Sequence, residues 1–170
     1  MTKAVELRRH TDNDGDALTD DGVRAALEIG ARLRGDYALL VSSGAQRSTQ
    51  TLACFLAGLG ERVPGGVIVE PGLRSGSEDR WREIYAKTGK PDLESFRGAD
   101  PDFVFAESRA LGDALSRVFA ALPDGGSRAL AVGHSPTNEV AVFALTGEVV
   151  EPLAKGAGVL VVEDGGVYRV

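Results

Sequence analysis

Short apolar segments alternate with helical patterns along most of this chain, and that order constrains its fold more than any other feature. Four extended segments are expected, at about residues 4–8, 37–42, 66–70 and 128–133. Strands separated by helices are typical of a mostly parallel sheet flanked by helices. Near the end, GVLVVEDGGVYRV contains two apolar runs joined by a turn that holds Asp164, Gly165 and Gly166. This pattern predicts a hairpin that finishes the sheet in the antiparallel sense.

Amphipathic patterns predict three helices around these strands. The first is expected from Thr19, which can cap it, to about Leu33. One face of this helix is predicted to pack on the sheet through Val23, Ala26, Leu27, Gly30 and Leu33. The other two helices are expected over about residues 46–59 and 103–122, where large apolar side chains repeat at helical spacing.

The length of the chain favours one domain. With 170 residues and 43% hydrophobic content, a single core can bury most of the apolar surface, so residues 1–170 are expected to form one unit. At about 72–102 the composition turns polar and is broken by glycine and proline. We interpret this segment as a polar cap inserted over the sheet edge. Trp81 and Tyr85, four residues apart, could contact the substrate or anchor this cap, and we favour anchoring.

The charge balance excludes several kinds of partner. A formal net charge of −6 repels nucleic acid and anionic lipid, so neither nucleic acid nor a membrane is expected as a partner. The first ten residues carry charges where a signal peptide needs an apolar stretch, and the single cysteine, Cys54, excludes an intrachain disulfide. These features predict a cytoplasmic protein, and nothing in them indicates an oligomeric state.

The segment AVGHSPT, residues 131–137, could be interpreted in two ways. A serine hydrolase would use Ser135 in a G-x-S-x-G turn, with its histidine later in the chain. Here Thr137 stands in place of the final glycine, and the only histidines, His10 and His134, both precede the serine. The serine hydrolase is therefore the less favoured alternative, and attention moves to His134.

Cationic side chains follow three of the predicted strands. Arg9 and His10 follow the first, Arg47 comes after the second, and His134 follows the fourth. Ligands of open α/β sheets bind at the carboxyl ends of the strands, so these four residues are expected in one crevice. Guanidinium groups match phosphate oxygens, and the helix N-termini that follow Arg47 and His134 would add backbone N–H groups. The sequence therefore predicts a phosphate site.

Four segments in order carry a resemblance to a known family. LRRHT resembles the signature L-x-R-H-G, SGAQRSTQT resembles S-x-x-x-R-[AS]-x-Q-T, and VGHSP resembles G-H-x-P. The helix sequence ALTDDGVRAALEIGARL is also similar to the one that follows the first signature. These are motifs of the histidine phosphatase superfamily, also called phosphoglycerate mutase-like. The resemblance implies a three-layer α/β/α sandwich with a mostly parallel central sheet.

The resemblance also implies a mechanism. His10 would be the nucleophile that becomes a phosphohistidine, Arg9 and Arg47 would hold the phosphoryl oxygens, and His134 would donate a hydrogen bond to them. No cofactor and no metal ion is implied. The short chain resembles the small bacterial phosphatases of the family, including phosphohistidine phosphatases, so the expected substrate is a phosphorylated small molecule or a phosphoprotein. The alternative is a catalytically weak module that binds a phosphorylated ligand.

Two positions depart from the family pattern. Thr11 replaces the glycine after the first histidine, and Ser75 stands where the obvious alignment would place the general-acid glutamate. Glu78 and Glu83 are the two candidates for that role in neighbouring registers. A surface position is an equally good interpretation of each, and the sequence does not choose between them.

Overall fold

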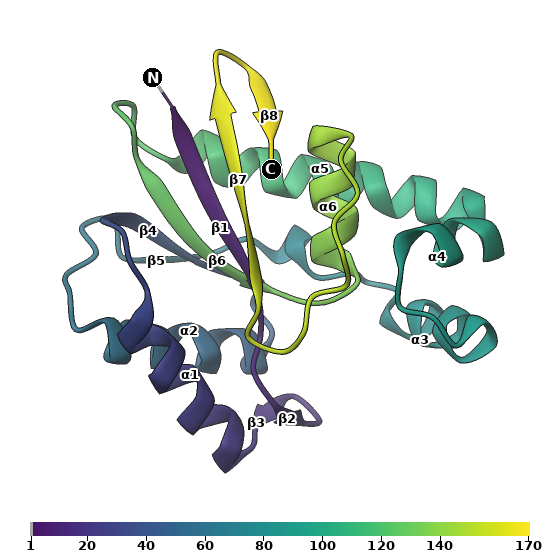
Figure 1. Ribbon diagram of the computed structural model, residues 1–170, viewed down its shortest axis with the longest axis horizontal. Coiled ribbons are helices and arrows are strands. Elements are labelled where there is room, and N and C mark those ends of the chain that lie inside the picture. The colour runs from purple at the N-terminus through teal and green to yellow at the C-terminus, as the bar shows by residue number, and fades with distance from the viewer. Residues whose placement is uncertain (1) are drawn as a thin grey trace.

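A computed structural model describes residues 2–170 and contains one six-stranded sheet (Figure 1). The strand order is β5-β4-β6-β1-β7-β8, with β1 Lys3–Arg9, β4 Tyr37–Ser42, β5 Val67–Val69, β6 Arg128–Gly133, β7 Gly158–Asp164 and β8 Val167–Arg169. The first four in this order pair in parallel, whereas β7 runs antiparallel to β1 and to β8. All four extended segments and the final hairpin are confirmed.

Helices cover both faces of the sheet, so the three-layer α/β/α fold is confirmed (Figure 1). One face packs against α1 (Asp20–Arg32) and α2 (Gln46–Leu59), and the other against α5 (Pro101–Ala121) and α6 (Thr137–Thr146). Between β1 and α1 the chain forms a small hairpin from β2 (Asn13–Asp14) and β3 (Ala17–Leu18). None of the helices in the described part of the chain has the length and apolar character needed to cross a membrane.

The inner face of α1 differs from the predicted one. The helix starts as expected, because the Thr19 side chain accepts a hydrogen bond from the Gly22 N–H. Ala26 and Gly30 are buried, but Val23 and Leu27 remain 37% and 39% exposed. The reason is a close approach to α2: a Cβ atom on Gly30 would lie 2.5 Å from the Phe55 carbonyl oxygen. Small residues therefore form the contact, and the larger side chains beside them face outward.

The polar segment at 72–102 is more ordered than the sequence suggests. After the short 3-10 helix η1 (Pro71–Leu73) it forms α3 (Glu78–Thr88) and α4 (Leu93–Ala99). Their buried side chains, among them Ile84 and Phe96, join the core under α5, and the Trp81 ring packs 4.9 Å from that of Phe103. This segment thus contains two helices, of which α4 packs on α5 and α3 packs on α4 (Figure 1).

Candidate functional site

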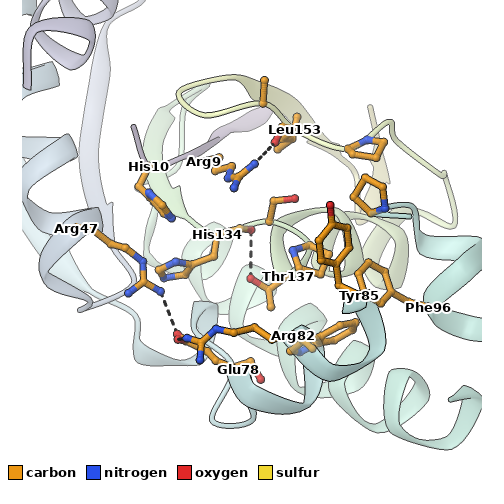
Figure 2. A pocket seen from close by; sticks show the side chains of 17 residues that line it. Arg9, His10, Arg47, Glu78, Arg82, Tyr85, Phe96, His134, Thr137 and Leu153 are labelled. Atoms are coloured by element: carbon orange, nitrogen blue, oxygen red, sulfur yellow. Dashed lines mark hydrogen bonds and ion pairs between the residues drawn. The ribbon is translucent and has the colours of Figure 1, made fainter. Parts of the chain in front are cut away.

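A pocket of about 550 Å³ lies at the carboxyl ends of the parallel strands, and all four predicted residues line it. Figure 2 shows Arg9, His10, Arg47 and His134 around this pocket. Glu78 also lines it. Glu83 does not, since its side chain is 65% exposed and pairs with Arg80 on the surface of α3. The structure thus brings together five of the six residues that the sequence suggested.

Strand register brings the two histidines together. Arg9 of β1 pairs with Gly133 of β6, so each histidine follows directly after a paired residue. The His10 N–H also donates to the Gly133 carbonyl oxygen at 3.1 Å. As a result the ring centroids of His10 and His134 lie 5.3 Å apart with their planes inclined by 60°.

The His10 ring is held as a neutral base. Its Nδ1 lies 2.8 Å from the Thr11 carbonyl oxygen, which can only accept, so Nδ1 carries the proton and Nε2 keeps its lone pair. Burial, helped by the charges of Arg47 and Arg9, lowers the pKa of His10 to about 4. The sequence predicted the effect of the arginines, but burial is the larger cause. At neutral pH this imidazole is therefore uncharged.

His134 is anchored from the next strand. Its Nε2 lies 2.8 Å from the hydroxyl oxygen of Ser43, which follows β4. Its Nδ1 is buried and has no hydrogen-bond partner among residues 2–170. Burial and the charge of Arg47 lower the pKa of His134 to about 3. Ser43 thus holds Nε2 in place, whereas Nδ1 makes no hydrogen bond within residues 2–170.

Arg47 is oriented by two carboxylates. Its Nη1 donates to Asp16 Oδ1 at 2.7 Å and its Nη2 to Glu78 Oε1 at 3.2 Å. Asp16 also accepts a hydrogen bond from the Gln46 N–H at the start of α2. Sequence reasoning missed Asp16, because only the folded β2–β3 hairpin brings it to this helix. The Arg47 side chain is 12% exposed, so the ion pairs are partly shielded from solvent.

The Glu78 carboxylate accepts hydrogen bonds from three arginines. Besides Arg47, it accepts from Arg74 Nε at 2.6 Å and from Arg82 Nη2 at 3.3 Å. Burial alone would raise the pKa of Glu78, but the Arg74 hydrogen bond and the charges of Arg47 and Arg74 lower it overall. A general acid must hold a proton at working pH, and a carboxyl surrounded by arginines loses its proton more readily.

The remaining predicted positions have clear structural partners. Arg9 Nη1 donates to the Leu153 carbonyl oxygen at 2.9 Å, while its Nε is buried and has no hydrogen-bond partner within residues 2–170. Thr11 is buried, and its hydroxyl donates to the Gly22 carbonyl oxygen at 2.8 Å. The backbone at Thr11 is not left-handed, so a glycine is not required there.

Ser135 shows none of the contacts of a hydrolase nucleophile. Its hydroxyl donates to Glu139 Oε1 at 2.6 Å, whereas the nearest hydroxyl to His134 Nε2 is that of Ser43. No hydrogen bond within residues 2–170 joins Ser135 to either imidazole. The serine hydrolase alternative therefore has no support in the geometry.

The far half of the pocket is apolar. Trp81, Tyr85 and Phe96 from α3 and α4 line it, together with Pro152 and Leu153. Figure 2 shows Tyr85 and Phe96 on the side of the pocket away from His10 and Arg47. Trp81 anchors the segment as expected, whereas Tyr85 is 50% exposed and lines the opening instead. Cationic groups thus lie at one end of the pocket and an aromatic wall at the other. No group of three or more histidine, cysteine or carboxylate side chains within residues 2–170 is arranged to hold a metal ion.

Comparison with known proteins shows a family match over most of the chain. The family model of the histidine phosphatase superfamily (branch 1) matches residues 2–153. No curated protein matches the chain.

Solved structures with the same fold include a phosphoglycerate mutase from Bacillus anthracis, with 17% identity and a TM-score of 0.75 over 99% of this chain and 91% of that one. A phosphoserine phosphatase from Entamoeba histolytica shares 15% identity, with a TM-score of 0.64 over 94% of this chain and 89% of that one. The protein histidine phosphatase SixA, complexed with tungstate, shares 20% identity, with a TM-score of 0.59 over 98% and 92%.

Proposed function

The chain belongs to branch 1 of the histidine phosphatase superfamily, and from this membership we propose that it is a metal-independent phosphatase. It hydrolyses a phosphomonoester or a phosphohistidine through a covalent phosphohistidine at His10. One observation carries the proposal: two neutral imidazoles 5.3 Å apart share a pocket with Arg9 and Arg47. Phosphoryl transfer to a histidine requires an uncharged imidazole as the nucleophile and cationic groups that bind the phosphoryl oxygens.

In the first step Nε2 of His10 attacks phosphorus. The contact between Nδ1 and the Thr11 carbonyl oxygen supports this choice, because it leaves the Nε2 lone pair available. The same contact stabilises the positive charge that the ring acquires as the P–N bond forms, since Nδ1 remains a donor. A low pKa keeps the ring unprotonated at neutral pH before attack.

The phosphoryl oxygens are bound by the groups around His10. Arg47 is already oriented by Asp16 and Glu78, so little ordering is needed when the ligand binds. Arg9 Nε, which is without a partner in residues 2–170, supplies a further donor. Donors placed beforehand around the transferring group stabilise the charge spread over its oxygens. The related fold of SixA is described in complex with tungstate, a tetrahedral oxyanion like phosphate.

In the second step water attacks the phosphohistidine and releases inorganic phosphate. The substrate is a phosphorylated small molecule or a phosphoprotein, and the apolar wall formed by Tyr85 and Leu153 would contact its leaving group. Water enters once that leaving group departs, because the pocket opens to solvent on this side.

Turnover of para-nitrophenyl phosphate with and without a chelator tests this function. Release of nitrophenol that survives chelation and is lost in His10→Ala is the expected result. Mass spectrometry of protein trapped at alkaline pH should then locate the phosphoryl group on His10. Tight binding of phosphate esters without release by the wild type would instead identify a binding module and overturn the proposal.

A further inference from the structure

The leaving oxygen needs a proton, and neither the two imidazoles of the pocket nor Glu78 is suited to supply one. His10 attacks as a neutral base, and burial with the charge of Arg47 lowers the pKa of His134 to about 3. Glu78 is held as a carboxylate by Arg47, Arg74 and Arg82. An alkoxide or phenoxide leaving without a proton departs slowly, and general-acid help is worth about 100-fold or more.

A buried carboxyl lies directly behind the pocket wall. Glu139, in the first turn of α6, is 4% exposed. Its Oε1 accepts hydrogen bonds from the Ser135 hydroxyl at 2.6 Å and from the Leu153 N–H at 2.7 Å. Its Oε2 is buried and has no hydrogen-bond partner among residues 2–170. Ser135 lines the pocket and Glu139 does not, so of these two residues only Ser135 is placed to contact a ligand there.

We propose that Ser135 and Glu139 form the proton relay for the leaving group, an inference that rests on the proposed phosphatase function. As the His10 Nε2–P bond forms and the P–O bond breaks, the electron pair of that bond stays on the leaving oxygen. For this transfer the Ser135 hydroxyl turns from Glu139 Oε1 to the leaving oxygen and gives that oxygen its proton, and the Ser135 oxygen takes the proton of the Glu139 carboxyl. Ser135 is the catalytic residue of the pair, and Glu139 acts through it.

Hydrolysis of the phosphohistidine restores the relay. The attacking water forms the new P–O bond and loses a proton to the Ser135 oxygen, which passes its own proton to the Glu139 carboxylate. The P–N electron pair returns to His10 Nε2. No proton is gained or lost by the enzyme over the cycle, and no other reactant is required.

The surroundings of Glu139 favour a carboxyl that keeps its proton. Burial raises the pKa of Glu139 above its ordinary value, although the hydrogen bonds from Ser135 and Leu153 and the charge of Arg9 act in the opposite direction. Its neighbours along α6, Val140, Ala141 and Val142, are all buried. An apolar site penalises the charged form of a carboxyl, which is how enzymes keep such groups protonated near neutral pH.

A purely structural role for Glu139 makes a different prediction. Arg9 donates to the Leu153 carbonyl oxygen while Glu139 accepts from the Leu153 N–H, so Glu139 also holds the segment that Arg9 contacts. Loss of that support would lower kcat/KM for every substrate by the same factor. Loss of a proton relay would impair substrates according to the basicity of their leaving oxygen.

Phenyl phosphate and para-nitrophenyl phosphate separate these roles, because their rings are similar and phenoxide is much the stronger base. In Glu139→Gln, which keeps the shape of the side chain, kcat/KM for phenyl phosphate should fall by about 100-fold. The loss for para-nitrophenyl phosphate should be at least about ten times smaller, because its leaving group departs without a proton. Ser135→Ala, which keeps the Glu139 carboxyl, should likewise lower kcat/KM much more for phenyl phosphate than for para-nitrophenyl phosphate. The matched control is Glu83→Gln, an exposed glutamate whose loss should affect neither ester.

Equal losses for the two esters in folded Glu139→Gln and Ser135→Ala, with folding checked by thermal unfolding, would overturn the relay. Failure of the underlying function looks different, because the wild-type protein would then turn over neither ester and form no phosphohistidine. If Glu139→Gln does not fold, the Ser135→Ala comparison decides alone. Trapped phosphohistidine in the slow variants would show that attack by His10 still occurs.

Discussion

The side-chain amide of Asn138 donates a hydrogen bond to the main-chain carbonyl oxygen of Arg8 at 3.0 Å. Its Oδ1 accepts from the His134 N–H at 3.2 Å, so one buried side chain contacts both strand ends that carry the histidines. Gly133 leaves room for this arrangement, because a Cβ atom there would lie 2.3 Å from Asn138 Oδ1. Asn138 therefore helps to set the spacing between the two imidazoles.

Asn138→Leu tests that role. The substitution removes a hydrogen bond from the partly buried Arg8 carbonyl oxygen and one from the buried His134 N–H, so the free energy of unfolding should fall by about 2–4 kcal/mol. Activity of the folded fraction should fall by about tenfold or more, since small displacements of reacting groups are costly. Denaturant unfolding and kcat/KM for para-nitrophenyl phosphate provide the measurements. Asn13→Leu, in the exposed hairpin, is the control and should change stability little. An Asn138 variant as stable as this control would contradict the assignment.

Both imidazoles should remain neutral in the folded protein well below pH 6.5. The folded-state pKa is about 4 for His10 and about 3 for His134, whereas an unfolded histidine titrates near about 6.5. Between these values the unfolded chain binds protons that the folded chain does not, so stability should fall as pH falls from 6.5 toward 4. NMR titration resolves the two rings directly, since the chain has only two histidines. A ring that titrates near 6.5 in the folded protein would refute the burial argument.

Asp16 should matter to catalysis through Arg47. Asp16→Asn weakens the ion pair that orients the guanidinium, and we expect kcat/KM to fall by about 5- to 10-fold, as for a modest loss of positioning. Asp14→Asn removes the same charge from the exposed side of the same hairpin, so it controls for long-range electrostatics. Steady-state kinetics on both variants provide the measurement. Equal effects of the two substitutions would show that only net charge matters.

Tyr85 should affect the leaving group and not the phosphoryl group. The ring lines the apolar half of the pocket while half-exposed, so Tyr85→Ala should raise KM for para-nitrophenyl phosphate by about 3- to 10-fold. Competitive inhibition by inorganic phosphate, which lacks a leaving group, should be unchanged. If the KM for para-nitrophenyl phosphate and the inhibition constant for inorganic phosphate rose together, the substitution would have displaced α3 itself.

The contact between α1 and α2 should not accept a methyl group. In Gly30→Ala the new Cβ would meet the Phe55 backbone, so we expect a loss of about 1–3 kcal/mol in the free energy of unfolding. Gly98→Ala, also within a helix but with open space around it, should instead gain up to about 1 kcal/mol from helix propensity. Chemical denaturation of both variants measures the difference, and similar values would argue against tight packing at Gly30.

Much of the fold and most of the candidate site could be predicted from sequence because both depend on local patterns. Buried parallel strands are continuous apolar runs, so β4 and β6 begin and end where expected. Because ligands of such sheets bind at the carboxyl ends of the strands, the sequence then predicts that Arg47 and His134 lie in one pocket. What the sequence does not encode locally is which polar side chains meet across the pocket. Asp16 and Ser43 reach Arg47 and His134 only through the folded chain.

The errors also have physical causes. No helix is predicted at α3, because glycine and proline interrupt the pattern there and apolar side chains are few, yet Trp81 and Ile84 are buried in the core. On α1, Val23 and Leu27 are predicted on the inner face and lie outside it, because only small side chains fit the close approach to α2 at Gly30, whereas Leu33 is buried as expected. The sequence did carry a signal for Glu139. It is the only charged residue in the helix TNEVAVFALT and directly precedes the apolar run VAVFAL, and a carboxylate that is buried needs hydrogen-bond or charge partners.

The pocket is assembled from two sources that are remote in the chain. The ends of β1, β4 and β6 supply the cationic half, whereas α3 and α4 supply most of the aromatic half. Evolution could therefore exchange residues 79–99 for a different pair of helices and keep the residues proposed for phosphoryl transfer, together with Glu78, which orients Arg47. In such a lineage the range of accepted compounds would diverge quickly, while the reaction itself would remain the ancestral one.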